Sequence, residues 1–246
     1  MTSLLAWHGC RADGTTRYLK VKEVVGVKTF LVGNVVLCVN ALHGSIRAVD
    51  MLRFSEGLWI KRTLHEGKIL LAADKIGSSE RTVIGEADAT QVVVDWAFWC
   101  ADRAVRIHAV TALRRAGMEA EAEKLVGLEA ITDQKSALAA AHTAAHALYA
   151  VDNAGNTNIT AHAAIYAASN AASRAAAVAD AASTADNTAC AAADAVDNAA
   201  STAFNTACAA YAADAAANGT EMSLLNAELE RRLLALMGLT EMEVTQ

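Results

Sequence analysis

The chain contains no proline among its 246 residues. Because proline costs about 3 kcal/mol inside a helix, its absence is compatible with long uninterrupted helices. Cysteine is scarce as well: the five cysteines are widely spaced, odd in number and never arranged as Cys-x-x-Cys. This spacing argues against a disulfide framework and against a cysteine zinc site. We therefore expect reduced thiols and a cytoplasmic protein.

Basic charge is also in short supply. The formal net charge is −6, and no run of lysine and arginine forms the stripe that binding to nucleic-acid phosphates requires. Between 137 and 218 the chain has six aspartates, and Arg174 is the only lysine or arginine. We therefore expect no nucleic-acid partner, and we interpret this acidic half as a solvated helical surface.

Long apolar runs and the common catalytic motifs are missing too. The most apolar stretch, 92–104, is short and is interrupted by Asp95 and Asp102, so we expect no membrane span. The first residues lack the basic and apolar regions of a signal peptide. No glycine-rich phosphate loop and no Gly-x-Ser-x-Gly occurs. His142 and His146 lie one helical turn apart, but the His-Glu-x-x-His pattern is absent, so no metal site is predicted.

The composition divides the chain into two parts. All four tryptophans lie in the first hundred residues, whereas alanine makes up about half of 137–217, far above normal usage. We predict the α+β fold class. A small, mostly antiparallel α+β domain is expected at 1–90, and a larger all-α, alanine-rich bundle or stack of helices with 18-residue repeats at 91–246.

The elements of the first part follow from β-branched and aromatic residues punctuated by glycine. We expect one short helix at 45–54, and a hairpin that turns at Glu66-Gly67. The expected strands are 18–25, 29–32, 35–39, 58–64, 68–73 and 81–84.

The second part shows apolar residues at steps of three and four, which indicates helices. Gly117 interrupts this pattern, and Thr132 or Asp133 can cap a helix that runs to about 151. From 159 to 217 there is neither glycine nor proline, and Asn218-Gly219 is typical of a helix C-terminus. The expected helices begin near 88, at 119, near 132, at 159 and at 220 or 223, the last one ending at 237.

A twelve-residue phrase occurs twice in the alanine-rich part, at 181–192 and at 199–210, with one difference, Asp186 against Phe204. Their offset of eighteen residues is five turns of an α-helix, about 27 Å, so each repeated side chain returns to the same azimuth. One face of such a helix is polar and the other carries almost only methyl groups. The sequence is compatible both with long helices and with a stack of shorter ones, because Asn, Asp, Ser and Thr also favour the capping positions at helix ends.

The alanine face allows close approach of a neighbouring helix, in the same chain or in a second copy. We therefore expect a homo-oligomer that forms through the alanine faces. Phe204 places an apolar ring where its twin has a charge, so we expect a contact there. The predicted binding residues are Phe204, Tyr211, Asp186 and Asp197.

The first part also resembles a known family. Its residues 25–30 and 37–45, with Ala48 and Leu52, are similar to a small domain family of unknown function found in phage and phage-related genes. The hallmark of that family is Leu-Cys-x-x-Gly-Leu-His-Ala-Ser. Here Ala41 replaces the first glycine of the hallmark and Gly44 its alanine. The resemblance covers roughly 5–95 and continues through 67–69, 74–76 and 80–84. The alanine-rich part resembles the tails of proteins labelled as immunity proteins.

A second resemblance is to the ADP-ribosyltransferase fold. Residues 5–9 are similar to the Leu-x-x-His-Gly strand that holds the nicotinamide ribose, and 42–45 lie where that family has Gly-x-Tyr-Phe-Ala. The strand at 58–67 occupies the next place in the order. The resemblance implies catalytic residues His8, His43 and Glu80, with NAD as cofactor. A histidine in place of the family's tyrosine alters the stacking surface for nicotinamide.

These observations predict a phage or mobile-element accessory protein that acts by protein–protein interaction. The specific form of this prediction is a protein that counters a host defence system. No cofactor is required for that role. The partner would be a host protein or a second copy, in the host cytoplasm. One alternative is an ADP-ribosyltransferase-like or NAD-cleaving enzyme that uses His8, His43 and Glu80. Another is a structural helical protein that associates with itself.

Overall fold

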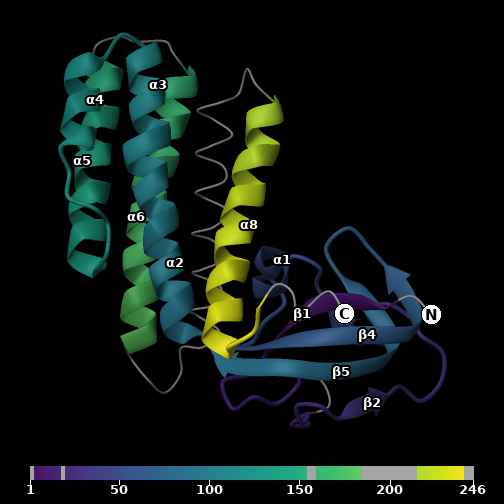
Figure 1. Cartoon of the computed structure of the whole chain (residues 1–246). Coiled ribbons are helices and arrows are strands. Elements are labelled where there is room, and N and C mark those ends of the chain that lie inside the picture. Colours follow the sequence, from purple (N-terminus) through teal and green to yellow (C-terminus); the bar gives the residue numbers. More distant parts are fainter. Residues whose placement is uncertain (1–2, 18–19, 154–158, 184–214, 241–246) are drawn as a thin grey trace. The chain divides into compact units, whose positions relative to one another are not determined.

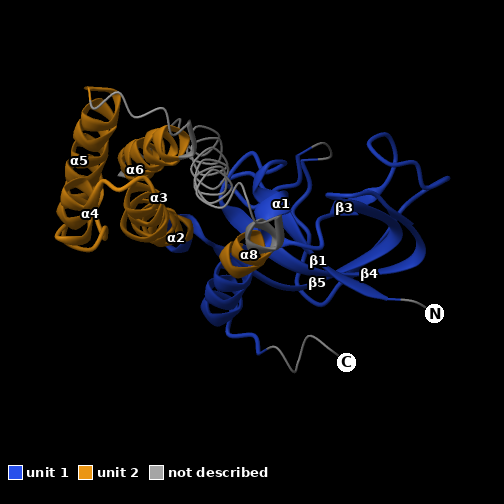
Figure 2. Ribbon diagram, turned by 90° about the horizontal axis from the view of Figure 1, so that it is seen from above, with its two compact units in different colours: residues 1–92, 226–246 blue, residues 93–225 orange. Residues whose placement is uncertain are grey.

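The computed structural model describes residues 3–17, 20–153, 159–183 and 215–240, and it has the α+β fold. The chain forms two compact units, shown in Figure 2. Unit 1 consists of 1–92 together with 226–246, and unit 2 of 93–225. The division lies close to the expected boundary after residue 90, but the last residues of the chain belong with the first unit rather than with the helices.

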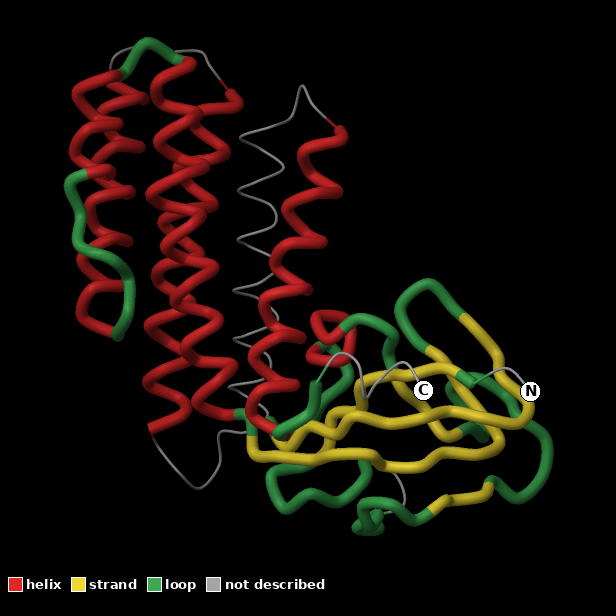
Figure 3. The backbone as a smooth tube through the Cα atoms, viewed as in Figure 1, coloured by secondary structure: helices red, strands yellow, loops and turns green. Residues whose placement is uncertain are grey.

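Unit 1 is built on one five-stranded sheet, drawn in yellow in Figure 3. Its pairings are antiparallel, in the order β1-β4-β5-β2, and β3 also pairs with β5. The strands are β1 Leu4–Cys10, β2 Lys28–Phe30, β3 Leu42–Gly44, β4 Trp59–Leu71 and β5 Ile76–Asp88. A short helix, α1 (Ala48–Leu52), follows β3 within the region expected to be helical.

The sheet curls so that its pairing closes on itself. Ser45, directly after β3, exchanges two backbone hydrogen bonds with Trp7 of β1, at 2.7 and 2.8 Å. Strands β1, β4, β5 and β3 therefore form a closed circuit of neighbours. Gly44 permits the close approach, because a Cβ atom there would lie 2.8 Å from His65 Nε2 and 2.9 Å from the Ala6 Cβ. The closure places side chains of several strands around one interior.

The expected hairpin turn at Glu66-Gly67 is wrong. Strand β4 continues through this point, with a register shift against β5 between Glu66 and Ile69. Gly67 has φ +71°, the left-handed conformation typical of a β-bulge. The chain reverses after β4 instead, where Ala72 N donates to Lys75 O at 2.9 Å. Gly67 therefore forms a bulge inside the longer strand β4 and not the turn of a hairpin.

Two other expected strands are absent from the described residues. Within 18–25, residues 20–25 have no strand pairing, and within 35–39 only a single bridge joins Val36 to Asn40. Both segments are rich in valine, which favours strands, but the valines at 24, 25, 36 and 39 remain exposed. The buried residue of the first segment is Glu23, held by ion pairs. These ion pairs, with Arg81 and Lys61, therefore anchor the loop that carries Glu23.

The end of helix α8 (Ala215–Met237) explains why the C-terminal residues belong to unit 1. Glu230 accepts hydrogen bonds from Trp7 Nε1 at 2.9 Å and from the backbone N–H of Ala48 at 3.3 Å. Asn226 accepts one from the backbone of Val49 at 3.3 Å. Leu229 and Leu233, four residues apart, are fully buried. These contacts tie the last turns of α8 to β1 and α1.

The described helices that contribute to unit 2 follow the expected order (Figure 1). Gly117, with φ +75°, ends α3, and Asp133 accepts a hydrogen bond from the backbone of Ser136, so it caps α5 as expected. The expected helix end at Asn218-Gly219 is wrong, because α8 runs through both residues. The helices are α2 Thr90–Arg103, the π-helix η1 Ala104–Ala109, α3 Val110–Arg115, α4 Glu119–Val126, α5 Gln134–Asn153, α6 Ile159–Ser183 and part of α8.

Alanine faces pack against each other inside unit 2. Helices α5 and α6 are neighbours, and Ser169 Oγ of α6 donates to the Ala141 carbonyl of α5 at 3.0 Å. Their buried residues include Ala140, Ala144, Ala164, Ala168 and Ala172. Small side chains let the two backbones approach closely. The alanine faces of α5 and α6 are therefore covered within the chain. The repeated phrases, with Asp186, Asp197, Phe204 and Tyr211, lie outside the described residues.

A buried ion cluster lies where α8 passes through unit 2. Glu221 accepts two hydrogen bonds from Arg103, both at 2.8 Å, and one contact at 3.0 Å from His108 of the π-helix. Burial opposes ionisation of Glu221, but the hydrogen bonds from His108 and Arg103 outweigh it and lower its pKa to about 2. The carboxylate is therefore charged at neutral pH and joins α2, η1 and α8.

Candidate functional site

Unit 1 contains a cavity of about 460 Å³. Its walls come from β1, from the loop between β1 and β2, from β3 with the residues around it, and from the β4–β5 turn. Most of the surface that lines it is apolar, and polar and charged side chains are present as well. A concave, largely apolar cavity of this size is typical of small-molecule sites.

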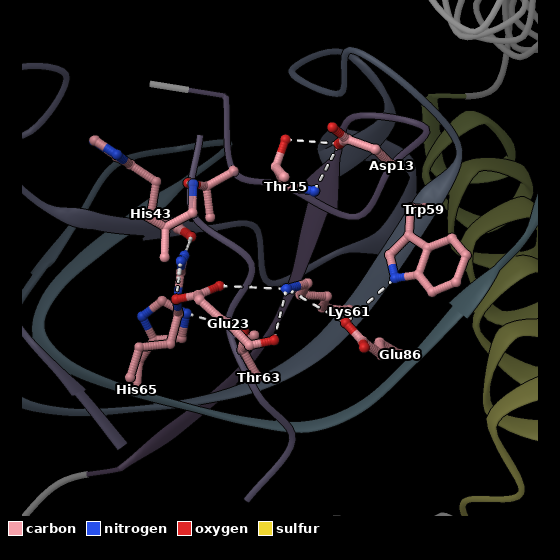
Figure 4. Close-up of polar contacts among 12 residues, drawn as sticks. Asp13, Thr15, Glu23, His43, Trp59, Lys61, Thr63, His65 and Glu86 are labelled. Atoms are coloured by element: carbon pink, nitrogen blue, oxygen red, sulfur yellow. Dashed lines mark hydrogen bonds and ion pairs between the residues drawn. The ribbon is translucent and has the colours of Figure 1, made fainter. Parts of the chain in front are cut away.

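An ion network forms the polar base of this site (Figure 4). Glu23 Oε1 accepts from Arg81 Nη2 at 2.6 Å and from Arg81 Nε at 3.1 Å. Lys61 Nζ lies 3.7 Å from Glu23 Oε2 and 3.3 Å from Glu86 Oε2, and its side chain is fully buried. Arg81 also donates to the His43 carbonyl. The network thus joins the loop between β1 and β2 to the strands β3, β4 and β5.

His65 of β4 is buried beside this network and held on both ring nitrogens. Nδ1 lies 2.8 Å from Ser78 Oγ, and that hydroxyl donates to the Glu80 carbonyl. The Thr63 hydroxyl lies 3.1 Å from both His65 Nε2 and the Ala6 carbonyl. Burial, and next the charge of Arg81, lower the pKa of His65 to about 3. His65 is therefore neutral at physiological pH.

His8 of β1 lies opposite Lys61 of β4 in the sheet register and lines the cavity. Its Nε2 atom is buried and has no hydrogen-bond partner among the described residues. Burial, followed by the charges of Arg81 and Lys61, lowers the pKa of His8 well below its ordinary value. His8 is thus a neutral imidazole with an unused ring nitrogen.

His43 of β3 lines the same cavity, but its ring is engaged. Its Nε2 accepts a hydrogen bond from the backbone N–H of Cys38 at 3.0 Å, which leaves the proton on Nδ1. Burial, then the charges of Arg81 and Lys75, lowers the pKa of His43. The non-glycine residue Cys38 has φ +64°, so this contact accompanies an uncommon backbone conformation.

The structure brings two of the three predicted catalytic residues together. His8 and His43 both line the cavity, whereas Glu80 does not. Successive residues of a strand point to opposite faces, and Arg81, the next residue, faces the cavity. Glu80 instead forms an ion pair with Lys28 at 3.2 Å. Glu23 is the one acidic residue among those that line the cavity.

Metal binding finds no support among the described residues. His142 and His146 are exposed on α5, and no group of three potential ligands is found there. The cysteines at 10, 38 and 100 form no disulfide. Burial raises the pKa of the Cys10 thiol to about 11, so it stays protonated. In the described segments, no helix has the length and apolar character needed to cross a bilayer.

Sequence reasoning missed Glu23, Lys61, His65 and Arg81. In β4, Lys61, Thr63 and His65 share one face of the strand, and a face made of polar side chains is usually solvated. Here that face is the interior, because the loop carrying Glu23 covers it. The only available signal was Glu23 itself, a lone acid in a valine-rich segment.

Comparison of the chain with protein-family models, with curated proteins and with solved structures finds no match to any of them.

Proposed function

We propose that unit 1 is a small-molecule-binding domain whose ligand enters the cavity beside His8. The unpartnered Nε2 atom of His8 carries this proposal. A buried acceptor without a partner costs about 1–3 kcal/mol, and a ligand that donates an N–H or O–H would recover it. Because the lowered pKa keeps His8 neutral, Nε2 can accept a hydrogen bond at physiological pH.

The geometry supports binding more directly than ADP-ribosyl transfer. The cavity has room for a drug-sized ligand, and both histidines implied by the resemblance line it. Glutamate-assisted chemistry fits less well, because Glu80 lies outside the cavity and Glu23 already pairs with Arg81 and Lys61. NAD is therefore one of the candidate ligands to be tested. Cleavage of NAD is a secondary proposal, in which neutral His8 acts as the base.

The first test is calorimetric titration of the full chain with a panel of nicotinamide riboside, nicotinamide mononucleotide, NAD, the common nucleosides and their 5′-monophosphates. At least one ligand should bind, and His8→Ala should weaken it about tenfold, since about 1.4 kcal/mol corresponds to that factor. His146→Ala, at an exposed histidine of α5, is the matched control and should bind normally. Absence of binding by every member of the panel would refute the proposal.

A protein-binding role is the second candidate, and one observation favours it. The chain around β2 exposes apolar side chains, among them Val32, which is 91% exposed, and Val39, which is 82% exposed. These side chains all lie between 24 and 39 in the chain, and exposed apolar patches are typical of interaction sites. A second copy of the chain is the partner that we propose for this surface, which is defined by Val24, Val25, Phe30, Val32, Val36 and Val39.

Sedimentation velocity tests this second candidate. The parent chain should associate as its concentration rises, and Val32→Asp/Val39→Asp should shift it to the monomer, because two carboxylates would have to be buried at the contact. Val126→Asp, at an exposed valine of α4, should leave the association unchanged. A parent chain that stays monomeric throughout the concentration series would contradict this role.

A further inference from the structure

Basic side chains outnumber acidic ones around the cavity, and part of this charge is neutralised. Arg81 is paired with Glu23, and Arg17 with Glu56 at 2.8 Å. Among the described residues no carboxylate forms an ion pair with either of the two remaining cations. The charged residues that line the cavity are Arg17, Lys22, Glu23, Lys75 and Arg81.

The two uncompensated lysines, Lys22 and Lys75, are each placed over an aromatic ring. Lys22 Nζ lies 5.6 Å from the ring centre of Trp59, and Lys75 Nζ lies 4.8 Å from that of Phe54. A ring face attracts an ammonium group without neutralising its charge. Asp74, the neighbour of Lys75 in the chain, does not line the cavity. Both lysines that line the cavity therefore keep their positive charge.

The remaining walls specify another part of the occupant. Val24, Leu42, Met51 and Phe54 supply apolar surface, which suits a ring or another apolar body. The Nε2 atom of His8 has no hydrogen-bond partner among the described residues, so a hydrogen-bonding group on that body would satisfy it. The positive charges and the apolar wall beside His8 thus call for two chemically different ends of one ligand.

We infer that the cavity takes a phosphomonoester joined to a ring that carries an N–H or O–H donor, with Lys22 and Lys75 binding the phosphate. This inference rests on the proposed small-molecule function and names its ligand class. A phosphomonoester carries a charge of about −1.5 to −2 at pH 7 and three acceptor oxygens, which matches two ammonium groups better than a single carboxylate does. Lysine is a common phosphate ligand that acts as a point charge.

The test compares each nucleoside, nicotinamide riboside included, with its 5′-monophosphate by calorimetry on the full chain. For the ring that binds, the monophosphate should bind at least tenfold more tightly than the nucleoside. Lys22→Met/Lys75→Met should remove this difference and leave nucleoside binding unchanged. The matched control is Lys68→Met, at an exposed lysine of β4 outside the cavity, which should behave like the parent.

Salt dependence provides a second measurement that needs no variant. Raising the salt concentration should weaken binding of the monophosphate and leave the nucleoside nearly unaffected, because charges near the surface are screened. Equal affinity for both, or a monophosphate affinity that survives the double substitution, would overturn the inference while the proposed function stands. Failure of every nucleoside and nucleotide to bind would overturn the proposed function as well.

Discussion

Unit 1 should lose stability steeply as the pH falls below about 6.5. His65 has its pKa lowered from 6.5 to about 3 in the folded chain, and the pKa of His8 is also well below its ordinary value. Between the folded and unfolded pKa values the unfolded chain binds protons that the folded chain does not. Stability is therefore fully present above about pH 6.5 and decreases as the pH falls toward the folded value.

The expected effect is large because His8 and His65 act in the same direction, and the lowered pKa of His43 adds to it. One proton taken up on unfolding changes the free energy of unfolding by about 1.4 kcal/mol per pH unit, so two histidines give roughly 3 kcal/mol per unit. A domain of ordinary stability, about 5–15 kcal/mol, would lose much of it between pH 6.5 and 4.5. Amide hydrogen exchange of peptides from β1, β4 and β5, corrected for the intrinsic rate at each pH, measures this change.

Two variants test the assignment. His65→Gln should lower the slope of stability against pH clearly, since it removes one of the three histidines of unit 1 with a lowered pKa and leaves His8 and His43. His146→Gln, at an exposed histidine of α5, should leave the slope of the parent chain. If protection of the sheet amides were the same at pH 7.5 and pH 5, His8 and His65 would not be the buried neutral histidines described above.

The sequence predicted the class of fold because its signals were local. Alanine content and the absence of proline indicate helices over any window of the second half, and glycine at 117 ends a helix by its own conformation. The α+β class and the start of α5 after Asp133 are confirmed for this reason. His8, His43 and Glu80 were predicted from a resemblance of short motifs; His8 and His43 line the cavity and Glu80 does not, while their catalytic role stays a prediction.

The remaining features depend on contacts between distant residues. Gly67 is equally suited to a turn and to a bulge, and only the pairing of β4 with β5 on both sides decides between them. Glu80 and Arg81 differ by one residue, and the strand register determines which of them faces the cavity. Glu230 lies 223 positions after Trp7 in the chain, so no local pattern could assign the end of α8 to unit 1.

Glu23→Gln should destabilise unit 1 by about 3–5 kcal/mol, the cost typical of removing one partner from a buried ion pair. Glu23 is 7% exposed and neutralises Arg81, which is 3% exposed, while also lying close to the fully buried Lys61. A glutamine amide cannot offset either charge. Urea denaturation followed by hydrogen exchange of the β4 and β5 amides would measure the loss.

The same substitution should abolish ligand binding at urea concentrations where the sheet is still folded. The loop that carries Glu23 also contributes Val21, Lys22, Val24 and Val27 to the cavity wall, so releasing its anchor opens that wall. Glu80→Gln is the matched control: this carboxylate pairs with the exposed Lys28, and both stability and ligand binding should stay close to the parent values. An enzyme that depends on Glu80 would instead lose activity in this control and keep its stability.

A double-mutant cycle separates the ion pair from the loop itself. If Glu23 acts by neutralising Arg81, then Glu23→Gln/Arg81→Met should cost clearly less than the sum of the two single substitutions, because no unpaired guanidinium remains. Lys61 would keep Glu86 as its partner at 3.3 Å. Strict additivity would mean that the cost of Glu23→Gln does not come from exposing the charge of Arg81, but from the other cation beside Glu23, Lys61 Nζ at 3.7 Å from Oε2.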